Sequence, residues 1–424
     1  WGIQLMTHKK KKSIIFPGGS KYTGELKDGA MHGQGTYINA NGDIYVGSFQ
    51  DDTFEGYGEL NLSDGTSFVG QWHNDLKHGQ GTSIFDNGEE HSGEYKNGMK
   101  CGKGIYKFEN GNLYEGDFLD DDMHGNGTLT YASGDKYEGE YDNNRIHGQG
   151  NYTSVDGFNY IGQWHENRRH GQGILTSDDG EIYDGSWRND EKHGKGKLTY
   201  PSGGNYEGEF IDGKFQGLGI YIWPGGDKYS GEWYKDDRHG QGTNTFSDGS
   251  NYIGQWQNDQ KYGKGTYTFA DGSKYVGEFA DNINGYGTYN FINGDKYVGE
   301  FKDGEFHGQG KFIHRIGNTY VGKYENGLEH GHGVQVNIDG DKYTGQFYRG
   351  ERHGLGTGTS PNGNVYVGEW KNGELHGKGA FTYHDGAKFV GEFQNDERHG
   401  KGIYTTPEGE VIDGIWEEGL ISEK

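Results

Sequence analysis

The chain has 424 residues, of which 29% are hydrophobic, 15% are aromatic and 83 are glycine. A net charge of −24 makes nucleic acid and anionic membrane surfaces unfavourable default partners. The single cysteine, Cys101, excludes an internal disulfide framework and is typical of a reducing compartment, and no apolar run approaches the 18 residues of a membrane helix.

The chain divides by pattern into a short start, a long periodic region and a short end. Residues 1–12 contain a basic run, Lys9 to Lys12, and are expected to be irregular. From 13 to 417 one frame organises the sequence: a Tyr-x-Gly step starts at Tyr22, repeat position 0, and the frame returns every 23 residues. We therefore expect about 17 complete repeats with a partial repeat at each end, followed by a C-terminal tail at 418–424.

The glycines follow this frame, at positions +2, +11, +13 and +20, and all five prolines stand at +18. Such regular placement excludes disorder, which the glycine content alone would suggest. One repeat, which starts at Tyr275, has 22 residues, and its missing residue is expected in the first turn, around 280–284.

Each repeat has the pattern of a β-hairpin. In one example, a strand at 229–233 leads through a turn at 235–237 to a second strand at 243–246. Positions 0, +2 and +4 share one face, so we expect aromatic rings from neighbouring strands to lie in a slot left by the glycine at +2. Position +3 is Glu or Asp in ten repeats, which predicts a solvated acidic opposite face. The predicted fold is all-β: an elongated, twisted, single-layer antiparallel sheet of consecutive hairpins.

Histidine at +10, present in 12 repeats, is the most prominent candidate for chemistry. Equivalent positions lie two strands, roughly 9.6 Å, apart, which is too far for shared zinc ligands, so we expect these histidines to hydrogen-bond backbone beside a glycine turn. Cys101 occupies the same position without an assignable base. The Gly-x-Gly steps do not open a helix, as phosphate loops do. No catalytic residue, cofactor site or metal site is therefore expected.

Residues 366–379, Tyr-Val-Gly-Glu-Trp-Lys-Asn-Gly-Glu-Leu-His-Gly-Lys-Gly, resemble the membrane occupation and recognition nexus (MORN) repeat. The resemblance covers nearly the whole of 13–417. It implies an elongated sheet that serves as a scaffold, often in cytoskeletal assemblies. The family includes radial-spoke head proteins of motile cilia, basal-complex scaffolds of parasites and junctophilin-type membrane tethers.

The sequence and this resemblance together favour a non-enzymatic scaffold that docks proteins in a cytoskeletal assembly, with the radial-spoke head of a cilium or flagellum axoneme as the leading candidate. A phosphoinositide-binding membrane tether and a basal-complex or other cortical scaffold are the alternatives. Self-association is plausible because sheet ends and aromatic rings are expected to be exposed, whereas membrane lipid is disfavoured by the net charge.

Repeats that depart from the consensus are the predicted partner-binding positions. The candidate residues are Phe54, Glu55, Tyr57, Phe215, Tyr262, His314 and Arg315.

Overall fold

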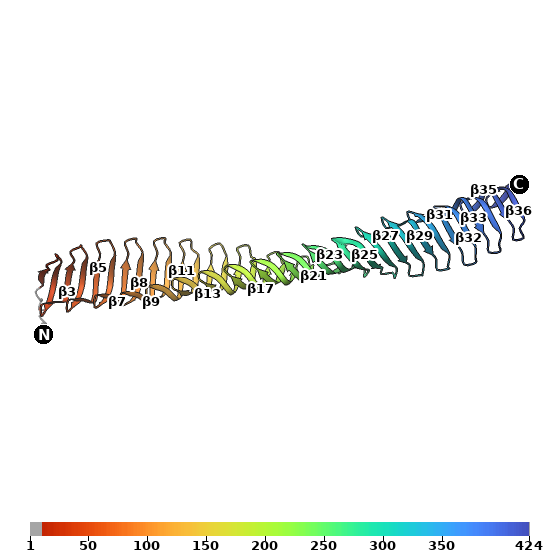
Figure 1. Ribbon diagram of the computed structural model, residues 1–424. Helices are drawn as coiled ribbons and strands as arrows, with labels where there is room; N and C mark the ends of the chain where they lie inside the picture. The colour runs from red at the N-terminus through yellow and green to blue at the C-terminus, as the bar shows by residue number, and fades with distance from the viewer. Residues whose placement is uncertain (1–10, 424) are drawn as a thin grey trace. The chain divides into compact units, whose positions relative to one another are not determined.

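The computed structural model describes residues 11–423, which form strands and turns with no helix. Two compact bodies divide the chain, one ending at Lys214 and the other beginning at Phe215. Of the basic run, Lys9 and Lys10 lie outside the described residues, and Lys12 begins the first strand. Figure 1 shows that within each body the strands follow one another in chain order.

The N-terminal body holds eighteen strands, each antiparallel to the next. They are β1 (Lys12–Ile15), β2 (Lys21–Lys27), β3 (Ala30–Ile38), β4 (Ile44–Gln50), β5 (Thr53–Asn61), β6 (Ser67–His73), β7 (Leu76–Ile84), β8 (Glu90–Lys96), β9 (Met99–Lys107), β10 (Leu113–Leu119), β11 (Asp122–Thr130), β12 (Lys136–Asp142), β13 (Arg145–Thr153), β14 (Asn159–His165), β15 (Arg168–Thr176), β16 (Ile182–Arg188), β17 (Glu191–Thr199) and β18 (Asn205–Ile211).

The C-terminal body continues the same alternation of seven- and nine-residue strands. They are β19 (Lys214–Ile222), β20 (Lys228–Tyr234), β21 (Asp237–Thr245), β22 (Asn251–Gln257), β23 (Gln260–Thr268), β24 (Lys274–Ala280), β25 (Asn282–Asn290), β26 (Lys296–Lys302), β27 (Glu305–Ile313), β28 (Thr319–Glu325), β29 (Leu328–Val336), β30 (Lys342–Tyr348), β31 (Glu351–Thr359), β32 (Val365–Lys371), β33 (Glu374–Thr382), β34 (Lys388–Gln394), β35 (Glu397–Thr405), β36 (Val411–Glu417) and β37 (Leu420–Glu423).

The predicted all-β, single-layer architecture of antiparallel hairpin repeats is confirmed in each body. Residues 420–423 of the expected C-terminal tail form β37, which pairs with β36.

The first turn of each hairpin explains the Asp, Asn and Gly residues at positions +6 and +7. Both central residues have positive φ, as at Asn258 (49°) and Asp259 (65°), which is the geometry of a two-residue type I′ turn. In the 22-residue repeat a single turn residue, Asp281, joins β24 to β25, and Ala280 pairs with Asn282. The predicted position of the missing residue is therefore confirmed.

A β-bulge in the complete hairpins that lie within each body explains the glycine at +11. In the β20–β21 hairpin, Gly231 pairs with Gly242 but the next pair is Glu232 with His239, so Gly240 and Gln241 are extra residues on the second strand. Gly240 has a φ of 58°, in the left-handed region that glycine adopts more readily than residues with a side chain.

The core lies on one face of the sheet, where the tyrosine at position 0 covers glycines. A Cβ added to Gly231 or Gly242 would overlap the ring of Tyr229, whose hydroxyl donates a 2.9 Å hydrogen bond to the carbonyl of Glu232. The slot is thus filled by a ring from the same strand, because the tyrosine side chain leans along its own strand, and not by a neighbouring strand as expected from sequence. We call this side of the sheet the aromatic face.

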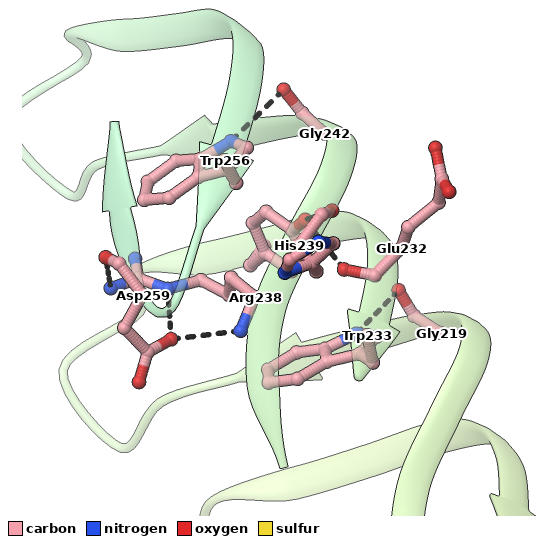
Figure 2. A network of polar contacts seen from close by, with 9 residues as sticks. Gly219, Glu232, Trp233, Arg238, His239, Gly242, Trp256 and Asp259 are labelled. Atoms are coloured by element: carbon pink, nitrogen blue, oxygen red, sulfur yellow. Dashed lines mark hydrogen bonds and ion pairs between the residues drawn. The ribbon is translucent and has the colours of Figure 1, made fainter. Parts of the chain in front are cut away.

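Rings at +4 join successive tyrosines into a continuous row. The ring of Tyr229 makes edge contacts with Trp233 of its own repeat at 5.0 Å and with Trp256 of the next repeat at 5.4 Å. The indoles of Trp233 and Trp256 also donate hydrogen bonds to the carbonyls of Gly219 and Gly242 (Figure 2). Within each body, aromatic packing on this face therefore holds neighbouring repeats together.

Candidate functional site

A groove crosses the opposite face of the N-terminal body, which we call the polar face. Its volume is about 1340 Å³, and its lining runs from Tyr57 on β5 to Ile161 on β14. The floor is the backbone of a row of paired glycines, such as Gly116 with Gly127 and Gly127 with Gly139. We call this hollow the glycine-floored groove.

Two rows of side chains form the walls of the groove. One wall consists of residues at positions +1 and +14: Val69, Thr82, Ser92, Ile105, Glu115, Thr128, Glu138, Asn151 and Ile161. The other wall consists of residues at +3 and +12: Tyr57, Gln80, Glu94, Lys103, Asn126 and Gln149.

The chemistry of the walls is mixed. Ile105 and Ile161 expose 43% and 54% of their surface, so apolar area is available between polar side chains. The groove is lined by three glutamates and only one lysine, Lys103. The Nζ atom of Lys103 is 2.7 Å from Asp117 Oδ1, so its charge is already paired. The groove is therefore amphipathic with an acidic bias, which suits a protein segment that carries both apolar and basic side chains.

The strands beneath the groove restrict how a partner is recognised. Each strand from β6 to β13 pairs on both sides, so backbone groups at the floor are used in the sheet and cannot accept an additional strand. The wall side chains are therefore the groups that the groove presents to a ligand. These walls contain neither histidine nor cysteine, so they present no pairing of a nucleophile with an imidazole base.

Among the predicted partner-binding residues of β5, only Tyr57 lines this groove, with 65% of its surface exposed. Phe54 lies on the aromatic face, stacked on Tyr45 at 3.7 Å between ring centroids. Glu55 accepts hydrogen bonds from His73 Nδ1 at 3.0 Å and from the backbone N–H of Asn74. The three residues therefore belong to different surfaces.

The remaining predicted residues are distributed over the C-terminal body. Phe215 on β19 is buried against Trp233, at 5.4 Å between ring centroids, whereas Tyr262 on β23 is 53% exposed. His314 and Arg315 follow β27 in a turn, where the backbone N–H of Arg315 donates to Asp295 Oδ1 at 2.8 Å. The structure does not bring them into one site, and their role in partner binding stays a prediction.

Sequence reasoning missed most of the groove because it treated positions +1 and +3 as one solvated acidic face. Val69 and Ile161 stand at +1, where a solvated face favours polar side chains. Branched aliphatic residues at an exposed strand position were the available signal.

The histidines at +10 differ from expectation in how they bond. In the repeat that starts at Tyr229, the tyrosine hydroxyl lies 3.4 Å from the backbone carbonyl of His239 and donates to it, while Nδ1 of the His239 ring is buried without a hydrogen-bond partner. The ring of His32 is likewise buried at Nδ1, 3.7 Å from Asp51. The backbone carbonyl, not the imidazole, makes the recurring contact.

Cys101, the variant at this position, lies opposite Glu94 in the β8–β9 pair. Burial and the negative charge of Glu94 raise the pKa of its thiol, which disfavours the reactive thiolate. Within residues 11–423, no group of three or more histidine, cysteine, aspartate or glutamate side chains is placed to hold a metal ion. Nor does that part of the chain contain a helix long and apolar enough to cross a bilayer.

Comparison with known families identifies the repeat. A family model described as the MORN repeat matches seventeen segments, at 22–44, 45–67, 68–90, 91–113, 114–136, 137–158, 160–182, 183–205, 206–228, 229–251, 252–274, 275–296, 297–319, 320–342, 343–365, 366–388 and 389–411. No curated protein sequence matches the chain.

Solved structures match this chain only weakly. The TCP10 domain of Danio rerio CPAP in complex with a STIL peptide is 15% identical, with coverage of 56% of this chain and 99% of that chain and a TM-score of 0.22. The TCP domain of Drosophila melanogaster SAS-4 in complex with a proline-rich motif of Ana2 is 13% identical, covering 41% and 86%, with a TM-score of 0.24. Virginiamycin B lyase from Staphylococcus aureus is 11% identical, covering 66% and 91%, with a TM-score of 0.12. Likenesses this weak carry no argument about function.

Proposed function

This chain belongs to the MORN repeat family, and we propose that it is a non-enzymatic scaffold that docks partner proteins, with the glycine-floored groove as one docking surface. The observation that supports this role most is the groove itself. It combines exposed Ile105 and Ile161, three glutamates and a fixed backbone floor over ten strands of the N-terminal body. A partner segment with apolar and basic side chains fits that surface.

The chain offers a matched pair of variants to test this proposal. Ile161 in the groove and Ile253 in the C-terminal body both stand at position +1, and both are 54% exposed. We expect Ile161→Glu to weaken capture of partner proteins from cells that express the protein, since it adds a charge to the apolar part of the wall. Ile253→Glu should leave the same set of proteins bound.

Quantitative mass spectrometry of proteins captured by tagged wild type and the two variants would measure the effect. Equal recovery by all three proteins would contradict docking in the groove. Circular dichroism of both variants controls for folding, because neither isoleucine lies on the aromatic face.

For the assembly itself, we propose the cytoskeleton, with the radial-spoke head of a motile cilium or flagellum as the specific candidate. The support is the family resemblance of the repeats. The test is fractionation of demembranated axonemes from a ciliated cell that expresses the tagged protein. Recovery with purified radial spokes is the expected result, and recovery wholly outside the axoneme would contradict the proposal.

A further inference from the structure

Position +9 on the aromatic face holds a cation or an apolar side chain in every complete repeat but one, in which it is Glu329. In the repeat that starts at Tyr229, the Arg238 guanidinium lies 4.3 Å from the ring of Trp256, and its Nε is 2.9 Å from Asp259 Oδ1 (Figure 2). A second guanidinium nitrogen donates to the backbone carbonyl of Asp259 at 2.9 Å. The arginine is thus held most closely by the ring of Trp256 and by the turn of the following repeat.

The N-terminal body repeats this arrangement. Arg169 lies 4.4 Å from the ring of Trp187, with its Nε 3.1 Å from Asp190 Oδ1 and its terminal nitrogen 2.9 Å from the carbonyl of Asp190. Two repeats in different bodies therefore form the same guanidinium site, from an aromatic ring and an aspartate at +7.

Near the start of the N-terminal body, the aspartates are kept but the cations are not. Position +9 is occupied there by Met31 and Phe54, and position +7 of the following repeats by Asp52 and Asp75. These four residues line a cavity of about 420 Å³ on the aromatic face, together with Phe16 and Tyr37. The cavity offers the carboxylates of the guanidinium site, with other rings beside them (Phe16, Tyr37 and Phe54) and no built-in guanidinium.

The carboxylates are available for a ligand. Asp52 and Asp75 each use Oδ1 to accept the backbone N–H of Met31 and Phe54, at 2.7 Å in both cases, and both side chains are exposed. In Asp190 and in Asp259, Oδ1 accepts the backbone N–H of the arginine at +9 and also the Nε–H of that arginine's side chain. The backbone bond therefore does not prevent a cation from binding.

We propose that this cavity receives an arginine side chain from a partner protein, beside turn aspartates equivalent to those that hold the chain's own arginines in other repeats. A guanidinium fits better than an ammonium because it stacks on a ring and donates in a fixed planar geometry. The flanking Phe16, Met31 and Phe54 favour apolar residues next to that arginine.

The test uses the full chain and a capped synthetic peptide, Leu-Ser-Arg-Leu-Ser-Leu, measured by isothermal titration calorimetry. Replacement of its arginine by citrulline keeps the shape and removes the charge. We expect citrulline to weaken binding by about tenfold or more, as for the loss of a charge-assisted hydrogen bond. Equal affinity for both peptides, or no binding of either, would overturn the proposal.

Asp52→Asn with Asp75→Asn should weaken binding of the arginine peptide to the same degree. The turn should survive, because Asn144 at the same position accepts the backbone N–H of Met123 at 2.8 Å. Asp396→Asn is the matched control, since Asp396 accepts the N–H of Leu375 and does not line the cavity. Loss of binding in the control alone would contradict the assignment.

Met31→Arg supplies the missing cation from the chain itself. We expect this variant to fold, to unfold at a higher urea concentration than wild type, and to block the peptide. Unfolding at a lower urea concentration would show that the cavity does not accept a guanidinium. Ile161→Glu, on the polar face, should leave peptide binding unchanged, so failure of the groove proposal and failure of this one are distinguishable.

Discussion

The two bodies have aromatic faces of the same design but differ in their polar faces. At position +1, the N-terminal body has charged residues in four of its repeats: Glu115, Glu138, Asp184 and Glu207. At the same position, the C-terminal body has exposed valines: Val276, Val321, Val367 and Val390, which expose 44%, 47%, 53% and 47% of their surface. The aromatic face supplies the core, so packing restricts which residues can stand on that face. The residues of the polar face are less restricted and vary more. The polar face is therefore where the two bodies differ in surface chemistry.

The largest expected effect comes from filling the shared glycine slot. Gly127→Ala in the N-terminal body and Gly242→Ala in the C-terminal body both stand at +13, where a Cβ would overlap the ring of Tyr114 or Tyr229. We expect each to lower the free energy of unfolding of its region by about 3 kcal/mol, because the ring has no free space to move into. Hydrogen exchange of the surrounding strands measures the loss.

Gly225→Ala is the control for these variants, since Gly225 has ordinary φ and no atom within 4 Å of the added Cβ. A change within about 0.5 kcal/mol is expected there. If one body tolerated the alanine at +13 while the other did not, the tyrosine would not pack equally tightly on the glycine in both bodies.

The second prediction concerns His91, which replaces tyrosine at position 0 in the N-terminal body. It is fully buried and neither ring nitrogen has a hydrogen-bond partner. Burial lowers the pKa of His91 to about 4, with a smaller contribution from Lys100. Since the unfolded chain then binds more protons between pH 6.5 and 4, stability falls as the pH decreases through that window.

His91→Tyr should remove this sensitivity and stabilise the region, by on the order of 1 kcal/mol more at pH 5 than at pH 7. Urea unfolding of both proteins at the two pH values measures the difference. A variant as acid-sensitive as wild type would rule out His91 as the cause.

The third prediction concerns the C-terminal body, where Glu329 stands at +9 among Tyr320, Tyr324 and Arg352. Burial raises the pKa of Glu329 to about 7, and Arg352 opposes that shift. The folded chain therefore holds a proton that the unfolded chain releases, and stability falls as the pH rises from 4.5 towards 7. This sign is opposite to that of His91.

Glu329→Leu, which copies Leu375 at the same position, should stabilise β28–β31 by on the order of 1 kcal/mol at pH 8 and by less at pH 5. Hydrogen exchange of these strands at both pH values measures the gain in stability. An equal gain at both would mean that packing, not ionisation, limits this repeat.

The smallest effect on stability is expected from making one polar face resemble the other. Glu115→Val with Glu138→Val gives the N-terminal body the valines of the C-terminal body, and we expect a change within about 0.5 kcal/mol. Capture of partner proteins should nevertheless change, because the groove loses two of its three glutamates. Unchanged capture would show that these charges do not select partners.

The sequence alone predicted the parts of this molecule that recur. The 23-residue spacing located the hairpins, and the 22-residue repeat placed its short turn correctly at Asp281. The Arg238–Asp259 pair was not predicted, because it joins residues 21 positions apart across two repeats and depends on the exact register. The groove was missed because a hollow depends on how the strands coil, which spacing does not specify. Phe54 and Tyr57 were grouped by sequence, yet strand alternation places them on opposite faces.

The turn aspartate at +7 has a consequence for how the chain is made. Met31 and Asp52 are joined by a bond across 21 residues, and the equivalent bonds recur at the same separation along each body. A hairpin leaving the ribosome thus needs only the next hairpin, and no distant segment, to complete its bonds. Bonds this local allow each body to form by adding one docked hairpin at a time.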